Sequence, residues 1–305
     1  MGAEIGLALA DSSEVGGNRR IANGIAAPEV PVLAARQLET GKLLAILFIV
    51  SIHPTVLHED STLVSGDFPG HARRFLQQKH NGIPIVTLTG AAGNQSPRYF
   101  ARSNTVAEAS RLGQLLGDSV AAAIETMSFL ADAKLAVAKD EIAELPFNEF
   151  PTVAAAKERE DNYLARFQKM RDDGNDAHAT RTAETDWFGA TRLRQLAELK
   201  ASGALEQGSR LSCLPVEIQL FQLGDWMFLA WPGEVFVEYA LELKKQFPNS
   251  HVITYANGHT QGYLVTAEAA KEGGYEASAA TFKSPDSPRA LLDASLQLIR
   301  DSAKL

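Results

Sequence analysis

Residues 83–98 constrain the fold of this 305-residue chain more than any other segment. The first six, Ile-Pro-Ile-Val-Thr-Leu, are mostly apolar and include β-branched side chains, which predicts a buried strand. Two glycines and a proline then end the strand in a tight turn. This turn carries Asn94, Gln95 and Ser96 to the carboxyl end of the strand, where open α/β sheets bind their ligands. On these residues alone, a surface loop without a function is the competing interpretation.

The rest of the chain alternates between strand-like and helix-like patterns. Predicted strands lie at 44–51, 134–141, 216–220, 226–231 and 252–255. Predicted helices lie at 71–79, 104–129, 152–171, 184–200, 235–247, 267–272 and 288–304. Residues 1–31 are rich in Gly, Ala and Asn and are predicted to be irregular. Strand–helix units, together with one hairpin at Gly224-Asp225, predict an α/β fold in which a mixed β-sheet is flanked by helices.

Composition and charge exclude several classes of protein. With 45% hydrophobic residues the chain can bury a large core, and its formal charge of −8 argues against a nucleic-acid partner. Cys213 is the only cysteine, so an internal disulfide and a cysteine-rich metal site are excluded. The longest apolar run, residues 43–52, is about half a membrane span and is predicted to be a strand. Residues 1–20 lack the layout of a signal peptide, and nothing in the sequence predicts a cellular location.

Polar residues at predicted strand ends are the candidates for chemistry. They are His53, Ser96, Glu234 and the tyrosines between 255 and 275. Histidine and glutamate together suit zinc, which binds imidazole nitrogen and carboxylate oxygen. Taken singly, each has a structural alternative: a hydrogen-bonded histidine, a first-turn helix glutamate and core tyrosines. Ser96 does not lie in a Gly-x-Ser-x-Gly elbow, so the local motif of a serine hydrolase is absent.

Five blocks of sequence resemble, in the same order, blocks of the neutral/alkaline (non-lysosomal) ceramidase family and its bacterial relatives. They are Asn18-Arg19-Arg20; Ile52-His53-Pro54-Thr55 followed by residues 63–70; Gly93-Asn94-Gln95-Ser96-Pro97-Arg98; Trp231-Pro232-Gly233-Glu234-Val235-Phe236; and Tyr255-Ala256-Asn257-Gly258 with Gly262-Tyr263 and Gly274-Tyr275-Glu276. The third block departs from the family pattern, because Asn94 replaces the usual aspartate and Arg98 the usual asparagine. Together the blocks span most of the chain.

The resemblance implies a zinc-dependent amidase that cleaves the N-acyl bond of ceramide, or of a related lipid amide, into fatty acid and amine. The implied Zn²⁺ ligands are His53, Glu234 and Tyr263. The implied catalytic residues are Ser96, Tyr275 at the scissile carbonyl, and Arg19 near the substrate head group, with Arg20 as its alternative. The implied partner is a ceramide-like lipid amide. Access to such a substrate is compatible with peripheral contact with a membrane, and no nucleic-acid partner is expected.

The family also carries two parts that this chain lacks: an upstream His-x-His-Ser-Gly-Pro block with the first zinc histidine, and a C-terminal β-sandwich domain. The expectation is therefore that residues 1–305 form a truncated ceramidase-like catalytic domain. Two alternatives stay open. One is a metal-free, non-catalytic remnant of that fold, and the other is a metal-independent serine hydrolase that uses Ser96.

A prediction about the gene follows from the absent histidine block. We expect an in-frame His-x-His-Ser-Gly-Pro block in the genomic sequence upstream of Met1, and a chain extended to include it should bind zinc more tightly than the 305-residue chain. Sequencing of the locus and metal content of the two chains check this. Strong zinc-dependent turnover by the short chain would contradict it and would point to another ligand, with His71 and His259 as the candidates.

Overall fold

A computed structural model describes residues 2–207, 213–258, 260 and 262–302 of the chain. By its contacts the chain divides into two compact units. The first comprises Met1–Ala138, Leu220–Ala230 and Val237–Thr254, and the second comprises Lys139–Gln219, Trp231–Phe236 and Tyr255–Leu305. The expected mixed α/β fold is confirmed, with strands in several sheets and helices against them.

The first unit contains a five-stranded mixed sheet with the order β5-β4-β3-β1-β7. Its strands are β1 Ala3–Asp11, β3 Glu29–Gln37, β4 Leu43–Val50, β5 Ile85–Thr89 and β7 Phe129–Leu130. β1 and β3 pair antiparallel along their whole length, whereas β4 and β5 pair in parallel. A parallel pair needs a crossover, and the helix α1, Asp67–Lys79, supplies it between β4 and β5.

Two sequence predictions about this sheet are wrong. Residues 1–31 are not irregular, because β1 and β3 form a long antiparallel pair within and beyond them. Alanine and glycine have low strand propensity, so tertiary pairing overrides the local signal here. The strand β5 is also not buried: it lies at the edge of the sheet, where only Ile85 is buried and Val86 is 45% exposed.

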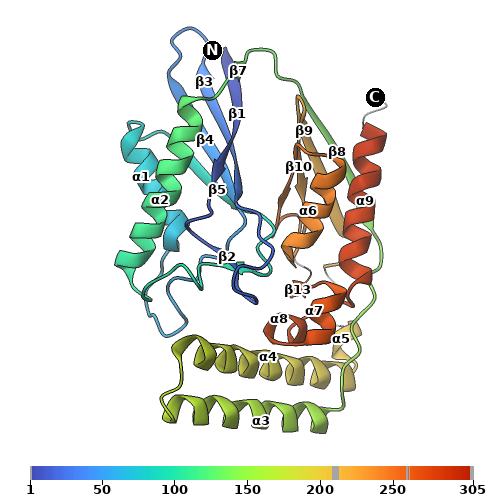
Figure 1. The fold of residues 1–305 in the computed structure, drawn as a ribbon. Coiled ribbons are helices and arrows are strands. Elements are labelled where there is room, and N and C mark those ends of the chain that lie inside the picture. Colours follow the sequence, from blue (N-terminus) through green and yellow to red (C-terminus); the bar gives the residue numbers. More distant parts are fainter. Residues whose placement is uncertain (1, 208–212, 259, 261, 303–305) are drawn as a thin grey trace. The chain divides into compact units, whose positions relative to one another are not determined.

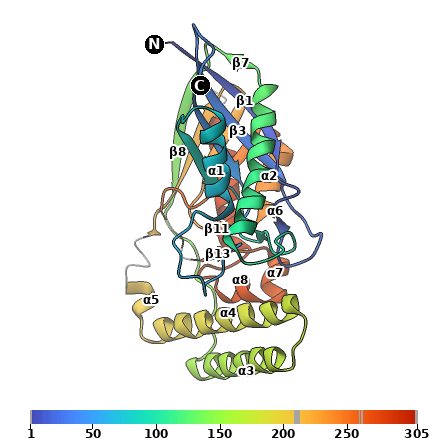
Figure 2. The same ribbon diagram turned by 90° about the vertical axis from the view of Figure 1, so that its left-hand side faces the viewer.

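Helices α1 and α2, the latter Val106–Glu125, lie side by side and cover one face of the five-stranded sheet (Figures 1 and 2). Fully buried apolar side chains from both helices and the sheet form the core, among them Phe48, Phe68 and Leu112. Gly113 of α2 allows close approach, since a Cβ atom there would lie 2.6 Å from the Phe68 carbonyl oxygen. The apolar periodicity that predicted α2 therefore marks its sheet-facing side.

A second, four-stranded sheet has the order β12-β10-β9-β8. Its strands are β8 Leu135–Ile142, β9 Val216–Leu223, β10 Trp226–Ala230 and β12 Ser250–Ile253. β9 and β10 are neighbours joined at Gly224-Asp225, so the predicted hairpin is confirmed, with Gly224 at φ +57°. Helix α6, Val237–Gln246, then connects β10 to its parallel neighbour β12.

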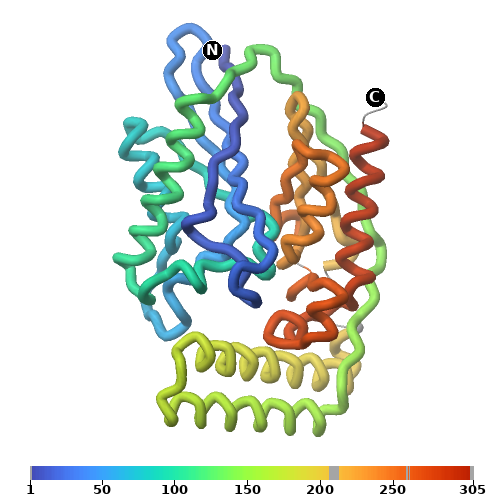
Figure 3. Tube along the Cα trace, in the orientation of Figure 1, coloured from blue at the N-terminus to red at the C-terminus, as the bar shows by residue number. Residues whose placement is uncertain are grey.

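The second unit is mainly helical. Helices α3, Val153–Asp172, and α4, Ala177–Ala201, form a helical hairpin (Figure 3) in which Phe167 stacks on Trp187 at 6.0 Å. The remaining helices are α5 Ala204–Gln207, α7 Ala267–Glu272, α8 Tyr275–Ser278 and α9 Asp286–Ser302. Two short strands, β11 Glu234–Val235 and β13 Tyr263–Leu264, pair in parallel. Among the described helices, none is long and apolar enough to cross a bilayer.

The close packing of α1 on α2 predicts the effect of adding one methyl group. We expect Gly113→Ala to destabilise the protein by about 1–3 kcal/mol, because the Phe68 carbonyl leaves no space for the added carbon. Gly70→Ala on α1 is the control, since a Cβ atom there meets no atom within 4 Å and helix propensity should stabilise it by about 0.5–1 kcal/mol. Chemical denaturation measures both, and equal effects of the two changes would contradict this packing.

Candidate active site

His53 follows β4 and is held by the backbone of a buried segment, residues 92–96, which we call the 92–96 segment. Its Nδ1 atom lies 2.6 Å from the Ala92 carbonyl oxygen and 3.2 Å from the Gln95 carbonyl oxygen. Because carbonyl oxygens only accept hydrogen bonds, Nδ1 carries a proton, and in the neutral ring the lone pair is then on Nε2. This is the tautomer in which the Nε2 of a histidine binds a metal.

The 92–96 segment also holds Arg19 and Ser96. The short strands β2, Gly17–Asn18, and β6, Gln95–Ser96, pair antiparallel. The Arg19 backbone N–H then donates to the Asn94 carbonyl at 2.9 Å, and its guanidinium donates to the Gly93 carbonyl at 2.8 Å. The structure thus brings His53, Arg19 and Ser96 to one segment of the first unit.

The burial of this segment rules out the interpretation of residues 94–96 as a surface loop. Asn94 and Gln95 are each 1% exposed and Ser96 is 5% exposed. The Ser96 hydroxyl accepts a hydrogen bond from the Arg98 backbone N–H at 3.2 Å. In the described part of the chain, this bond between the Ser96 hydroxyl oxygen and the backbone two residues later stabilises the turn that contains Ser96.

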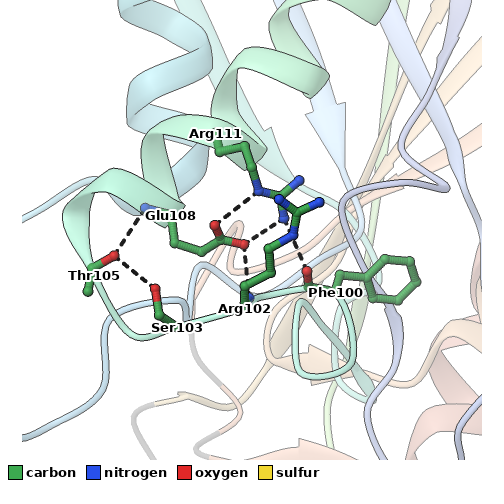
Figure 4. Close-up of polar contacts among 6 residues, drawn as sticks. All are labelled: Phe100, Arg102, Ser103, Thr105, Glu108 and Arg111. Carbon is green, nitrogen blue, oxygen red and sulfur yellow. Dashed lines mark hydrogen bonds and ion pairs between the residues drawn. The ribbon is translucent and has the colours of Figure 1, made fainter.

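A carboxylate at the start of α2 anchors the loop that follows Ser96 (Figure 4). Glu108, 6% exposed, accepts hydrogen bonds from the Arg111 guanidinium, at 3.0 Å for Nε, and from the Arg102 backbone N–H at 2.9 Å. The Arg111 guanidinium also donates to the Phe100 carbonyl at 3.2 Å. The hydrogen bond from Arg111, with a further one from the Arg102 backbone, lowers the pKa of Glu108 to about 2, against burial that would raise it.

The second unit brings together Glu234, Tyr263 and Tyr275. Glu234 and Tyr263 are directly paired residues of β11 and β13, so their side chains project to the same face of this small sheet. The ring of Tyr275, the first residue of α8, packs edge-on against the Tyr263 ring at a centroid distance of 5.5 Å and an angle of 66°. Two phenol groups and one carboxylate thus share a small region.

Glycines shape this arrangement in a way that the sequence analysis missed. Gly233, just before Glu234, has φ +104° and faces the Thr260 side chain, whose hydroxyl donates to the Pro232 carbonyl at 3.2 Å. Gly262, just before Tyr263, has φ +132°, and a Cβ atom there would lie 2.6 Å from the Ala279 carbonyl oxygen. The glycines immediately before Glu234 and Tyr263 were the available signal for these tight turns.

The predicted residues therefore form two groups, one in each unit, and the convergence of all of them at one metal site stays a prediction. No cluster of three His, Cys, Asp or Glu side chains suited to a metal occurs among the described residues. Of the two alternative ligands, His71 lies on α1 with its ring beside Arg74, and His259 lies outside the described residues.

The anchoring role of Glu108 predicts a pH-dependent stability. Its folded pKa of about 2 lies below the ordinary 4.5, so its contribution should be complete above pH 4.5 and lost as the pH falls toward 2. We expect Glu108→Gln to cost about 1.5–3 kcal/mol at pH 7 and progressively less below pH 4.5.

Thermal unfolding between pH 7 and pH 2 measures this difference. Glu125→Gln is the matched control on the same helix, because the Glu125 side chain is 70% exposed and lies 3.6 Å from Lys79. Exposed ion pairs contribute little, so this change should have almost no effect. A pH-independent cost for Glu108→Gln would contradict the charge-based anchor.

Comparison with known proteins identifies the fold. No protein-family model and no curated protein matches this sequence. The neutral ceramidase of Pseudomonas aeruginosa matches with a TM-score of 0.65 at 15% identity, over 97% of this chain and 51% of that chain. A structure described as ceramidase complexed with C2 matches with a TM-score of 0.65 at 13% identity, over 98% of this chain and 54% of that chain. This chain spans about half the length of both structures, and it has the fold of that part of a neutral ceramidase.

Proposed function

We propose that this chain is a zinc-dependent hydrolase of N-acyl amides, acting on ceramide or a related lipid amide. The observation that carries the proposal is the hydrogen bonding of His53, whose Nδ1 contacts the Ala92 and Gln95 carbonyls. In the neutral ring this places the proton on Nδ1, which is the tautomer that a zinc ligand bonded through Nε2 requires. The fold shared with a neutral ceramidase supports the same function.

The side chains that the proposal assigns to zinc carry donor atoms that zinc accepts. We infer that His53 supplies imidazole nitrogen, Glu234 carboxylate oxygen and Tyr263 phenolate oxygen, which are donors that zinc accepts. Tyr263 is 6% exposed and pairs directly with Glu234, so a positive ion beside it would favour its phenolate. A bound zinc ion would supply Lewis acidity toward the amide carbonyl and would lower the pKa of water to about 7.

The other residues would bind and orient the substrate. Tyr275, held against Tyr263, would donate its phenolic proton to the carbonyl oxygen as negative charge develops there. Arg19, fixed by the Gly93 carbonyl, would face the polar head group of the substrate. Ser96 would contribute a hydroxyl beside the acyl bond, with its oxygen oriented by the Arg98 N–H.

The lipid substrate implies contact of the first unit with a membrane surface. Its loops near the 92–96 segment expose several apolar side chains, which are Ile21, Ile25, Leu63, Val64 and Tyr99. Two hydrogen bonds hold these loops: the Gln95 side chain donates to the Ile25 carbonyl at 3.1 Å, and the Asn104 side chain bonds the His58 ring at 2.9 Å. Exposed apolar side chains of this kind would contact lipid when the protein lies at a membrane surface.

Zinc affinity of single-residue variants tests the ligand assignment. We expect His53→Ala and Tyr263→Phe each to weaken zinc binding by more than ~10–100-fold, which is the loss caused by changing a residue that only orients a metal ligand. His71→Ala is the matched control, because this histidine lies on α1 beside Arg74 and should not affect affinity. Competition with a chromophoric chelator gives the affinities, and equal affinity in wild type and His53→Ala would refute the assignment.

Release of fatty acid from a short-chain ceramide tests the reaction. The proposal predicts weak turnover by the 305-residue chain, which chelators abolish, added zinc restores and His53→Ala lacks. Turnover that resists chelators and depends on Ser96 would instead support a metal-independent serine hydrolase. A folded chain that neither binds zinc nor releases fatty acid would support a non-catalytic remnant of the fold.

A further inference from the structure

The carboxamide of Asn94 occupies a buried position at the start of α6, within the first unit. Its Oδ1 atom accepts hydrogen bonds from the Val237 backbone N–H and from the Gln95 side chain, each at 3.0 Å. Its Nδ2 atom donates to both carboxylate oxygens of Glu238, at 3.1 and 2.9 Å. One side chain thus caps a helix that begins 143 residues away in the sequence.

The carboxamide at position 94 suits both of its neighbours, Val237 and Glu238. An amide supplies both the acceptor for Val237 and the donor for Glu238, whereas an aspartate would supply acceptors only. Aspartate is the residue of the resembling family block. At position 94 it would place a second negative charge within hydrogen-bonding distance of the Glu238 carboxylate. Two carboxylates so close cannot both ionise without a penalty. The identity of residue 94 is therefore tied to the identity of residue 238.

We propose that Asn94 is a positioning residue and that Asn94 and Glu238 form a matched pair, which fixes the 92–96 segment against the start of α6. The Asn94 carbonyl accepts from Arg19, and the flanking Ala92 and Gln95 carbonyls hold His53. A displaced Asn94 would therefore shift the imidazole directly. The inference deepens the proposed function, on which its consequence for zinc rests, whereas the pairing itself does not depend on that function.

A double-mutant cycle tests the pairing. We expect Asn94→Asp to lower the thermal midpoint strongly at pH 8 and less at pH 5, because protonation of one carboxyl group restores a donor. Combination with Glu238→Gln should remove both the loss and its pH dependence, since the donor and acceptor have exchanged places. The ionisable groups bonded to this segment also include His53 and Arg19, and both are present in every variant.

Asn162→Asp, at an exposed position of α3, is the control for one added negative charge and should leave the midpoint unchanged. If Asn94→Asp does not fold at pH 8, recovery at pH 5 and in the double variant still supports the pairing. A single variant as stable as wild type at pH 8, or a double variant no better than the single one, would overturn it.

Zinc affinity of the same variants tests the positioning role. We expect Asn94→Asp at pH 8 to bind zinc at least ~10-fold more weakly than wild type, because loss of a residue that orients a metal ligand costs ~10–100-fold in affinity. The double variant should regain the zinc affinity of wild type. Unchanged affinity in a destabilised Asn94→Asp would overturn the positioning role. If wild type binds no zinc, the proposed function fails, whereas the unfolding cycle still decides the pairing.

Discussion

The structure of the first unit depends on satisfying the buried polar groups of the 92–96 segment. Backbone groups this deeply buried must find hydrogen-bond partners within the protein. His53, Arg19 and the short strand β2 provide them for the backbone, and α6 provides them for the Asn94 side chain. The partners come from three distant parts of the sequence, around residues 17–19, 53 and 237, so the conformation of the segment depends on all three.

The same constraint explains why this segment can carry chemistry. A side chain whose hydrogen bonds are fixed has lost its rotational freedom before a ligand arrives, which lowers the cost of binding. His53 is fixed in this way, through Nδ1, in the tautomer that suits a metal. In the second unit, the direct pairing of Glu234 with Tyr263 and the ring contact with Tyr275 orient a group of oxygen donors in a comparable way.

Much of the fold was predictable from the sequence, for identifiable physical reasons. Helix α2 was predicted because its apolar residues recur at helical spacing, and the structure adds an N-cap at Thr105, whose hydroxyl accepts from the Glu108 N–H. The hairpin at Gly224-Asp225 was predicted because two-residue turns need such residues. β1 was not predicted, because its small residues carry little strand propensity and its stability comes from pairing with β3.

The candidate site was predictable as a set of residues but not as a geometry. The five blocks identified residues that the structure gathers into two groups, yet no local pattern could show that Asn94 faces Glu238, 144 residues away. Nor could the sequence show that residues 94–96 are buried, because turn residues are usually exposed. Such contacts depend on the order of strands in a sheet, and spacing along the chain does not encode that order.

Anomalous diffraction from crystals grown with zinc tests the central claim, that the 92–96 segment fixes His53 in the tautomer that binds a metal. The account predicts a peak at the zinc absorption edge bonded to the Nε2 atom of His53. A peak bonded elsewhere, such as at His71, with His53 away from any metal, would contradict it.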